Sequence, residues 1–197
     1  MKLINGGVCA AEGFLANGIH CGIRKNKTKR DLALIYSETR ANTAAVYTTN
    51  LVKGAPLKVT KDNIADGYAQ AIICNSGNAN TCNANGIEIA EEISSLLANE
   101  LGIPADDVVV ASTGVIGQEL FIGIAVHVHI HEVIQQILAE SLTGRKDDPL
   151  TFCRIPIVQI GIVTQIFHGA VAVKIIVEGV PDVLFLYLDF LHIVFAG

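Results

Sequence analysis

The sequence predicts a mixed α/β protein in which layered sheets are flanked by helices. Short segments rich in β-branched residues recur through the first 120 residues, and one long amphipathic helix interrupts them. A chain of 197 residues is long enough to bury a sizeable core without disulfides. We therefore expect residues 1–197 to form a single domain.

Four strands are expected in the first part of the chain. They cover residues 31–37, 44–49, 69–74 and 108–110. The third is followed by Asn75-Ser76-Gly77-Asn78, a combination typical of turns. The fourth leads into the small, hydroxyl-bearing and glycine residues of Ala111–Gly117, which predict a sharp turn with free backbone N–H groups.

The clearest helix is expected over Ile87–Leu101. Its apolar residues recur every three or four positions and form one stripe, consisting of Ile87, Ala90, Ile93, Leu97 and Leu101. Asn85 is a suitable N-cap, Gly102 a suitable residue after the last turn, and Pro104 prevents continuation.

Composition excludes several classes of partner. Only 17% of the residues are charged, the mean hydropathy is +0.46 and the formal net charge is −5. A chain this apolar predicts that a partner covers part of its surface, while the negative charge argues against nucleic acid. No apolar segment of signal-peptide length follows Met1, and the apolar run Val183–Phe195 is too short to span a membrane. We expect a cytoplasmic protein without a membrane segment.

Five cysteines are present, and no two form a C-x-x-C pair. They are Cys9, Cys21, Cys74, Cys82 and Cys153. An odd number without metal-ligand spacing favours free core thiols in a reducing compartment over disulfides or a metal site.

Two polar clusters have alternative interpretations. Residues 24–30 carry five positive charges, which suit either an anion such as a cofactor phosphate or, as we favour, a solvated loop. His127, His129 and His131 would lie on one face of a strand, where three imidazoles are able to bind zinc. No further ligand of suitable spacing completes that site, so an exposed strand face is favoured and no metal is expected.

The chain changes character after residue 120. All twelve asparagines precede this point, and isoleucine, valine, leucine and phenylalanine make up about half of the remaining 77 residues. Residues 155–163 and 170–177 are predicted as strands.

Residues 111–117 also suggest a catalytic role. A threonine hydroxyl beside a glycine N–H is able to stabilise a developing oxyanion, although the same composition occurs in structural loops. The other segments of the first 120 residues favour a catalytic role for this loop over a structural one. In order, they are Gly13-Phe14, Gly18-Ile19, Asp31–Ile35, Tyr47–Asn50, Ala55–Leu57, the N-S-G-N-A-N of residues 75–80 and the S-T-G-V-I-G of residues 112–117. Over residues 1–120 the chain resembles the bifunctional glutamate N-acetyltransferase/ornithine acetyltransferase family of arginine biosynthesis.

This resemblance implies the fold of ornithine acetyltransferases and self-processing threonine-nucleophile aminopeptidases. Family members cut themselves once into an α and a β chain. The N-terminal threonine of β attacks N-acetylornithine, holds the acetyl group and passes it to glutamate. The family's T-G pair, which stabilises the oxyanion, corresponds here to Thr113 (hydroxyl) and Gly114 (N–H). The resemblance implies no cofactor, although some members use acetyl-CoA as donor.

Chain length fits an α chain that ends at Gly197. The resemblance then implies that the nucleophile lies on a β-chain partner, with a dimer of αβ pairs as the assembly. The last third, however, lacks the family's T-T-D-T and K-G-S-G-M segments, and leaves Thr164 as the remaining substrate-binding candidate there. Divergence, a reading-frame shift and unreliable residue assignment would each produce such a tail.

Two other functions compete with the acetyltransferase. A self-processed amidohydrolase or aminopeptidase would use water in place of glutamate as acyl acceptor. A non-catalytic subunit would keep the scaffold and lack activity even with a β chain.

Overall fold

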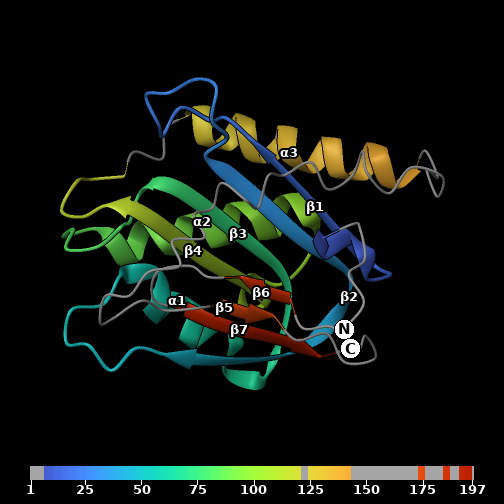
Figure 1. The fold of residues 1–197 in the computed structure, drawn as a ribbon, viewed down its shortest axis with the longest axis horizontal. Coiled ribbons are helices and arrows are strands. Elements are labelled where there is room, and N and C mark those ends of the chain that lie inside the picture. Colours follow the sequence, from blue (N-terminus) through green and yellow to red (C-terminus); the bar gives the residue numbers. More distant parts are fainter. Residues whose placement is uncertain (1–6, 121–123, 143–172, 176–183, 187–190, 197) are drawn as a thin grey trace.

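The computed structural model describes the chain except for residues 1–6, 121–123, 143–172, 176–183, 187–190 and 197. Its main sheet has the strand order β1-β2-β3-β4, with β7 also paired to β2. The strands are β1 (Phe14–Ile19), β2 (Leu32–Tyr47), β3 (Tyr68–Asn78), β4 (Val108–Val115) and β7 (Leu191–Ala196). Only the β3–β4 pair is parallel among these neighbours, because α2 (Gly86–Leu101) connects the two strands as a crossover. The mixed α/β fold is confirmed (Figure 1).

Strand β2 is one bent strand where the sequence suggested two. Its first part lies between β1 and β3, and its last six residues pair with β7. The bend falls where the register with β3 shifts, between Tyr36 and Ala41. The predicted strand at 69–74 is confirmed but extends through Asn78, so the expected turn at 75–78 is wrong.

One face of the sheet is covered by α2 and α3 (Ile124–Leu142) (Figure 1). The predicted stripe of α2 supplies Ala90, Ile93 and Leu97 to this core. Ile87 of that stripe is exposed, and Ile89, which was not in it, is buried in its place. The predicted helix is confirmed almost to the residue, with Asn85 at the N-cap position and Gly102 left-handed at the C-cap.

The helix α1 (Ala55–Asn63) was not predicted, and it runs along the edge of β4 that pairs with no other described strand, here called the free edge of β4. It begins with proline near its first position, Pro56, which suits a helix N-terminus. Leu57 packs with Ile72, Val109 and Ala111 in a second core on the opposite face from α2.

The predicted strand through the three histidines is wrong, because residues 124–142 form α3. A helix turns about 100° per residue, so positions 127 and 129 lie on different sides of it. His131 instead pairs with Glu100 of α2, with 2.9 Å between Nδ1 and Oε2. Among the described residues, no group of three histidine, cysteine, aspartate or glutamate side chains lies close enough to hold a metal ion.

Beyond α3, the described parts of the chain are short strands. β5 (Val173–Ile175) lies within the predicted segment 170–177 and pairs with β6 (Leu184–Leu186). The strand predicted at 155–163 lies outside the described residues. Within the described part of the chain, no helix combines the length and the apolar character that a membrane crossing requires.

Candidate active site

Thr113 and Gly114 lie within β4, near its carboxyl end, rather than in the sharp turn that the sequence suggested. They pair with Ser76 and Gly77 of β3. Because β3 and β4 are parallel, the ends of both strands meet at the same edge of the sheet. The two motifs N-S-G-N-A-N and S-T-G-V-I-G are therefore neighbours in space.

The direction of the β4 backbone groups follows from two contacts with α1. The Thr60 hydroxyl accepts a hydrogen bond from the Val110 N–H (3.0 Å) and donates one to the Val110 carbonyl (2.9 Å). Asn63 donates to the Val108 carbonyl over 2.8 Å. Backbone groups alternate in direction along a strand, so residues 108, 110, 112 and 114 turn theirs away from β3.

The backbone groups of Val115 point the other way, towards β3. The Val115 carbonyl accepts a hydrogen bond there from the Ala79 N–H over 2.9 Å. This alternation directs the Gly114 N–H to the free edge of β4. The first turn of α1 carries Pro56 and Leu57, and Leu57 lies in one apolar cluster with Ala111 of β4. Among the described residues, the half-buried Thr113 hydroxyl has no hydrogen-bond partner. Within the part of the chain that the structure describes, the Thr113 hydroxyl is therefore available to an oxyanion, and the Gly114 N–H lies on the edge of β4 away from β3.

Gly114 is required by its surroundings. Its φ is +136°, and a Cβ atom there would lie 2.3 Å from the carbonyl carbon of Gly77 and 2.6 Å from the nitrogen of Asn78. Gly77 itself has a φ of +108°. The two glycines thus pack backbone against backbone, which no other residue allows.

Asparagine side chains form hydrogen bonds that connect the segments around the Gly77–Gly114 contact. Asn75, which is 4% exposed, accepts a hydrogen bond from the Ser112 hydroxyl and donates one to the Asn78 carbonyl. Asn78 in turn accepts the Asn80 N–H (2.7 Å) and donates to the Gln118 carbonyl (2.8 Å). The segments that follow β3 and β4 are therefore held together by side-chain amides.

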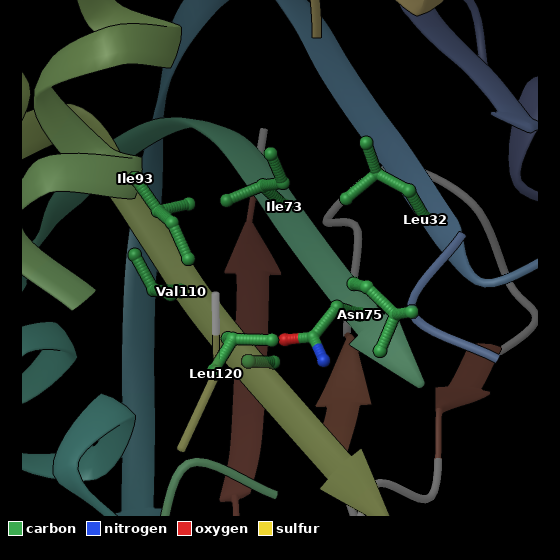
Figure 2. A pocket seen from close by; sticks show the side chains of 8 residues that line it. Leu32, Ile73, Asn75, Ile93, Val110 and Leu120 are labelled. Atoms are coloured by element: carbon green, nitrogen blue, oxygen red, sulfur yellow. The ribbon is translucent and has the colours of Figure 1, made fainter. Parts of the chain in front are cut away.

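A small cavity lies under the strand ends, between the sheet and α2 (Figure 2). Asn75 points into it, and the other lining side chains are apolar. It is lined by Ile23, Leu32, Ile73, Asn75, Ile93, Val110, Ala111 and Leu120. This lining offers no charged group to a polar substrate, so the cavity is a packing gap behind the site.

Two of the thiols, Cys21 and Cys74, are not nucleophile candidates at this site. Cys9, Cys21, Cys74 and Cys82 form no disulfide with one another. Cys21 is buried, as the prediction of core thiols requires, but Cys82 is exposed, and Cys153 lies outside the described residues. Burial raises the pKa of Cys74 to about 12, and burial together with the nearby Asp31 carboxylate raises the pKa of Cys21 to about 12. Both therefore remain protonated at neutral pH.

The basic segment 24–30 divides into two parts. Lys25, Lys27 and Lys29 are exposed, which fits the favoured solvated loop. Arg24 is half-buried, and its Nε donates to the Ser76 hydroxyl over 2.9 Å. Of the remaining predicted site residues, Thr164 and Gly197 lie outside the described residues.

Comparison with known proteins identifies this architecture. A crystal structure of the arginine biosynthesis bifunctional protein ArgJ from Bacillus halodurans matches with a TM-score of 0.62 and 42% identity, covering 67% of this chain and 69% of that one. An ornithine acetyltransferase from Mycobacterium tuberculosis, complexed with ornithine, matches with a TM-score of 0.61 and 33% identity, covering 66% of this chain and 70% of that one. The fold is that of the ornithine acetyltransferases.

The ArgJ family model matches residues 15–148. The arginine biosynthesis bifunctional protein ArgJ of Caldanaerobacter subterraneus is 39% identical over 180 residues, which are 91% of this chain and 41% of that protein. The protein of the same name from Listeria monocytogenes is 47% identical over 122 residues, 61% of this chain and 30% of that protein. The chain belongs to the ArgJ family, and it spans less than half the length of these relatives.

Proposed function

We propose that this chain is the α part of an acetyltransferase that moves an acetyl group from N-acetylornithine to glutamate. Membership of the ArgJ family supports this activity, as does the structural likeness to a protein described as an ornithine acetyltransferase complexed with ornithine. In this proposal Thr113 and Gly114 form the oxyanion hole. The observation that carries the proposal is the backbone phase of β4, which turns the Gly114 N–H away from β3.

The proposed reaction has two acyl transfers. A threonine hydroxyl on the β chain attacks the acetyl carbonyl of N-acetylornithine, and the free α-amine of that threonine takes the hydroxyl proton. The resulting oxyanion accepts hydrogen bonds from the Thr113 hydroxyl and the Gly114 N–H. When the intermediate collapses, the C–N bond breaks and the proton passes to the leaving amine of ornithine. The amine of glutamate then attacks the acyl-threonine ester and releases the β-chain hydroxyl.

The partner in this proposal is the β chain that supplies the threonine, with two αβ pairs in the assembly. The exposed apolar side chains Val115 (53%) and Ile116 (59%) lie directly beyond the oxyanion pair. Exposed apolar groups next to a site are typical of a surface that another chain covers. N-acetylornithine and glutamate are the proposed substrates. Acetyl-CoA is a further donor to test, and no cofactor enters the proposed reaction.

The experiment is acetyl transfer from labelled N-acetylornithine to glutamate by the chain assembled with its β partner. Thr113→Ala removes one donor, which costs about 3 kcal/mol of transition-state stabilisation, so turnover falls about a hundredfold. The KM for N-acetylornithine changes little, because the interaction exists only in the transition state. Thr113→Ser keeps the hydroxyl and retains most of the turnover.

Thr39→Ala is the matched control, since Thr39 is an exposed threonine on the distant bend of β2. Unchanged turnover in Thr113→Ala would contradict the oxyanion assignment. Release of free acetate without glutamate, at the rate of transfer, would indicate the hydrolase instead. A correctly assembled pair with neither activity would indicate a non-catalytic subunit.

A further inference from the structure

The segment Cys21–Arg24 is fixed behind the end of β3 by one buried carboxylate. The side chain of Asp31 has no exposed surface. Its two oxygens accept the N–H of Cys21 over 2.6 Å and the N–H of Arg24 over 2.8 Å. The Asp31 carbonyl also accepts the Ser76 N–H over 2.8 Å. One residue therefore ties both ends of the segment and the end of β3 together.

From this fixed position, the side chain of Arg24 packs over Gly77. A Cβ atom on Gly77 would lie 2.9 Å from Cγ of Arg24 and 3.1 Å from Cγ2 of Ile23. The Arg24 Nε donates to the hydroxyl of Ser76, the residue that pairs with Thr113. The aliphatic part of Arg24 thus packs on Gly77 while its guanidinium holds the preceding residue.

The next residue in this series of contacts is Gly114 of the proposed oxyanion pair. The backbone of Gly77 is in contact with Gly114, where the missing Cβ leaves room for it. A continuous stack therefore leads from Asp31 through Arg24 and Gly77 to Gly114. Protein interiors transmit small displacements because they are close-packed. A shift of Gly77 would move the Gly114 N–H relative to the oxyanion.

From this stack we infer that Arg24, held by Asp31, is a positioning residue for the Thr113–Gly114 pair. The inference rests on the proposed function, because it assigns Arg24 to the same site. Arg24 acts through Ser76 and Gly77 rather than by touching substrate.

The test uses Arg24→Met, which keeps an aliphatic side chain over Gly77 but loses the donor to Ser76. Ser76→Ala removes the acceptor of the same hydrogen bond. Each variant, assembled with the β partner, is expected to lower kcat about tenfold and to change the KM for N-acetylornithine less than about twofold. The double variant falls no further than either single variant, because all three lose one and the same bond.

Lys25→Met is the matched control, since Lys25 is an exposed cation in the same loop. Its kcat stays that of the wild type. A second readout is amide hydrogen exchange of the peptide covering residues 112–118. Exchange there becomes faster in Arg24→Met and stays unchanged in Lys25→Met.

Wild-type kcat in Arg24→Met, or losses that multiply in the double variant, would overturn the inference. So would unchanged exchange at residues 112–118. Thr113→Ala is assayed in the same series to separate the two claims. If Thr113→Ala is impaired and Arg24→Met is normal, the positioning role alone fails. If Thr113→Ala is as active as the wild type, the proposed oxyanion hole fails and the inference fails with it.

Discussion

The side-chain oxygen of Asn75 accepts a hydrogen bond from the Ser112 hydroxyl over 2.5 Å. The two residues are register partners on the parallel strands β3 and β4, and Ser112 directly precedes Thr113. Because Asn75 is also bonded through its amide to the Asn78 carbonyl (2.9 Å), it holds β4 and the irregular end of β3 at once. Asn75, the first asparagine of the N-S-G-N-A-N segment, thus fixes the strand ends that carry Thr113 and Gly114.

Replacing Asn75 by leucine is expected to destabilise the fold by about 1–3 kcal/mol, because the Asn78 carbonyl and the Ser112 hydroxyl lose partners in a buried place. Turnover is expected to fall as well. Ser112→Ala removes one side of the pair and costs about 1 kcal/mol. Urea denaturation of both variants and the double variant measures the coupling. Independent, additive losses would contradict the link.

Gly114→Ala is expected to cost about 3 kcal/mol or more, because the new Cβ would meet the Gly77 backbone at 2.3 Å in a conformation with φ of +136°. Turnover should be lost even where the variant folds. Gly117→Ala is the matched control. Gly117 also has a positive φ (+73°), but a Cβ there has no neighbour within 4 Å.

That control is expected to lose only about 1 kcal/mol, the cost of a left-handed alanine. Thermal unfolding compares the two variants directly. Equal losses would show that the positive φ, and not the contact with Gly77, determines the requirement for glycine at position 114.

Thr60 is expected to protect the free edge of β4. Thr60 is fully buried, and its hydroxyl bonds both backbone groups of Val110. Thr60→Val has nearly the same shape but leaves these groups without partners, so we expect a loss of about 2–4 kcal/mol. Thr60→Ser keeps both bonds and loses one methyl group, about 1 kcal/mol. Similar losses in both variants, measured by urea denaturation, would contradict this role.

The sequence predicted the elements whose patterns are local. The helix predicted at 87–101 and the strand predicted at 108–110 depend on neighbouring positions, and both are confirmed, although Ile87 of the predicted stripe is exposed. The turn expected at Asn75–Asn78 is wrong because β4 supplies a parallel partner that the local pattern does not show. Helix α1 escaped prediction because its burial is limited to a few residues, with lysines between them.

The candidate site also contains residues that the sequence identifies and residues whose roles depend on distant parts of the chain. Thr113 and Gly114 were assigned through the family resemblance, and the strand phase places the Gly114 N–H on the edge of β4 away from β3. Arg24 was noted as part of a basic loop, and Asn75 as part of a turn signal and of the N-S-G-N-A-N segment, but neither was given a role at the site. Their contacts span 52 and 37 positions of the chain, and residue patterns do not encode such distances. Alternation of apolar residues in the histidine segment was misleading, since a helix buries Ile130 and Ile134 equally well.

The protein is expected to lose stability in alkaline solution. Burial raises the pKa of Cys74 from its ordinary value to about 12, and that of Tyr47 also to about 12. A group whose pKa is higher in the folded state stabilises fully below the unfolded pKa, which is about 8.5 for a thiol. This stabilisation is lost as the pH rises from there towards 12, by about 1.4 kcal/mol per pH unit for a thiol that stays protonated when folded. Urea denaturation at pH 7, 9 and 10.5 measures the fall. Cys74→Ala should make it shallower, whereas equal stability at pH 7 and 10.5 would contradict the burial of these protonated groups.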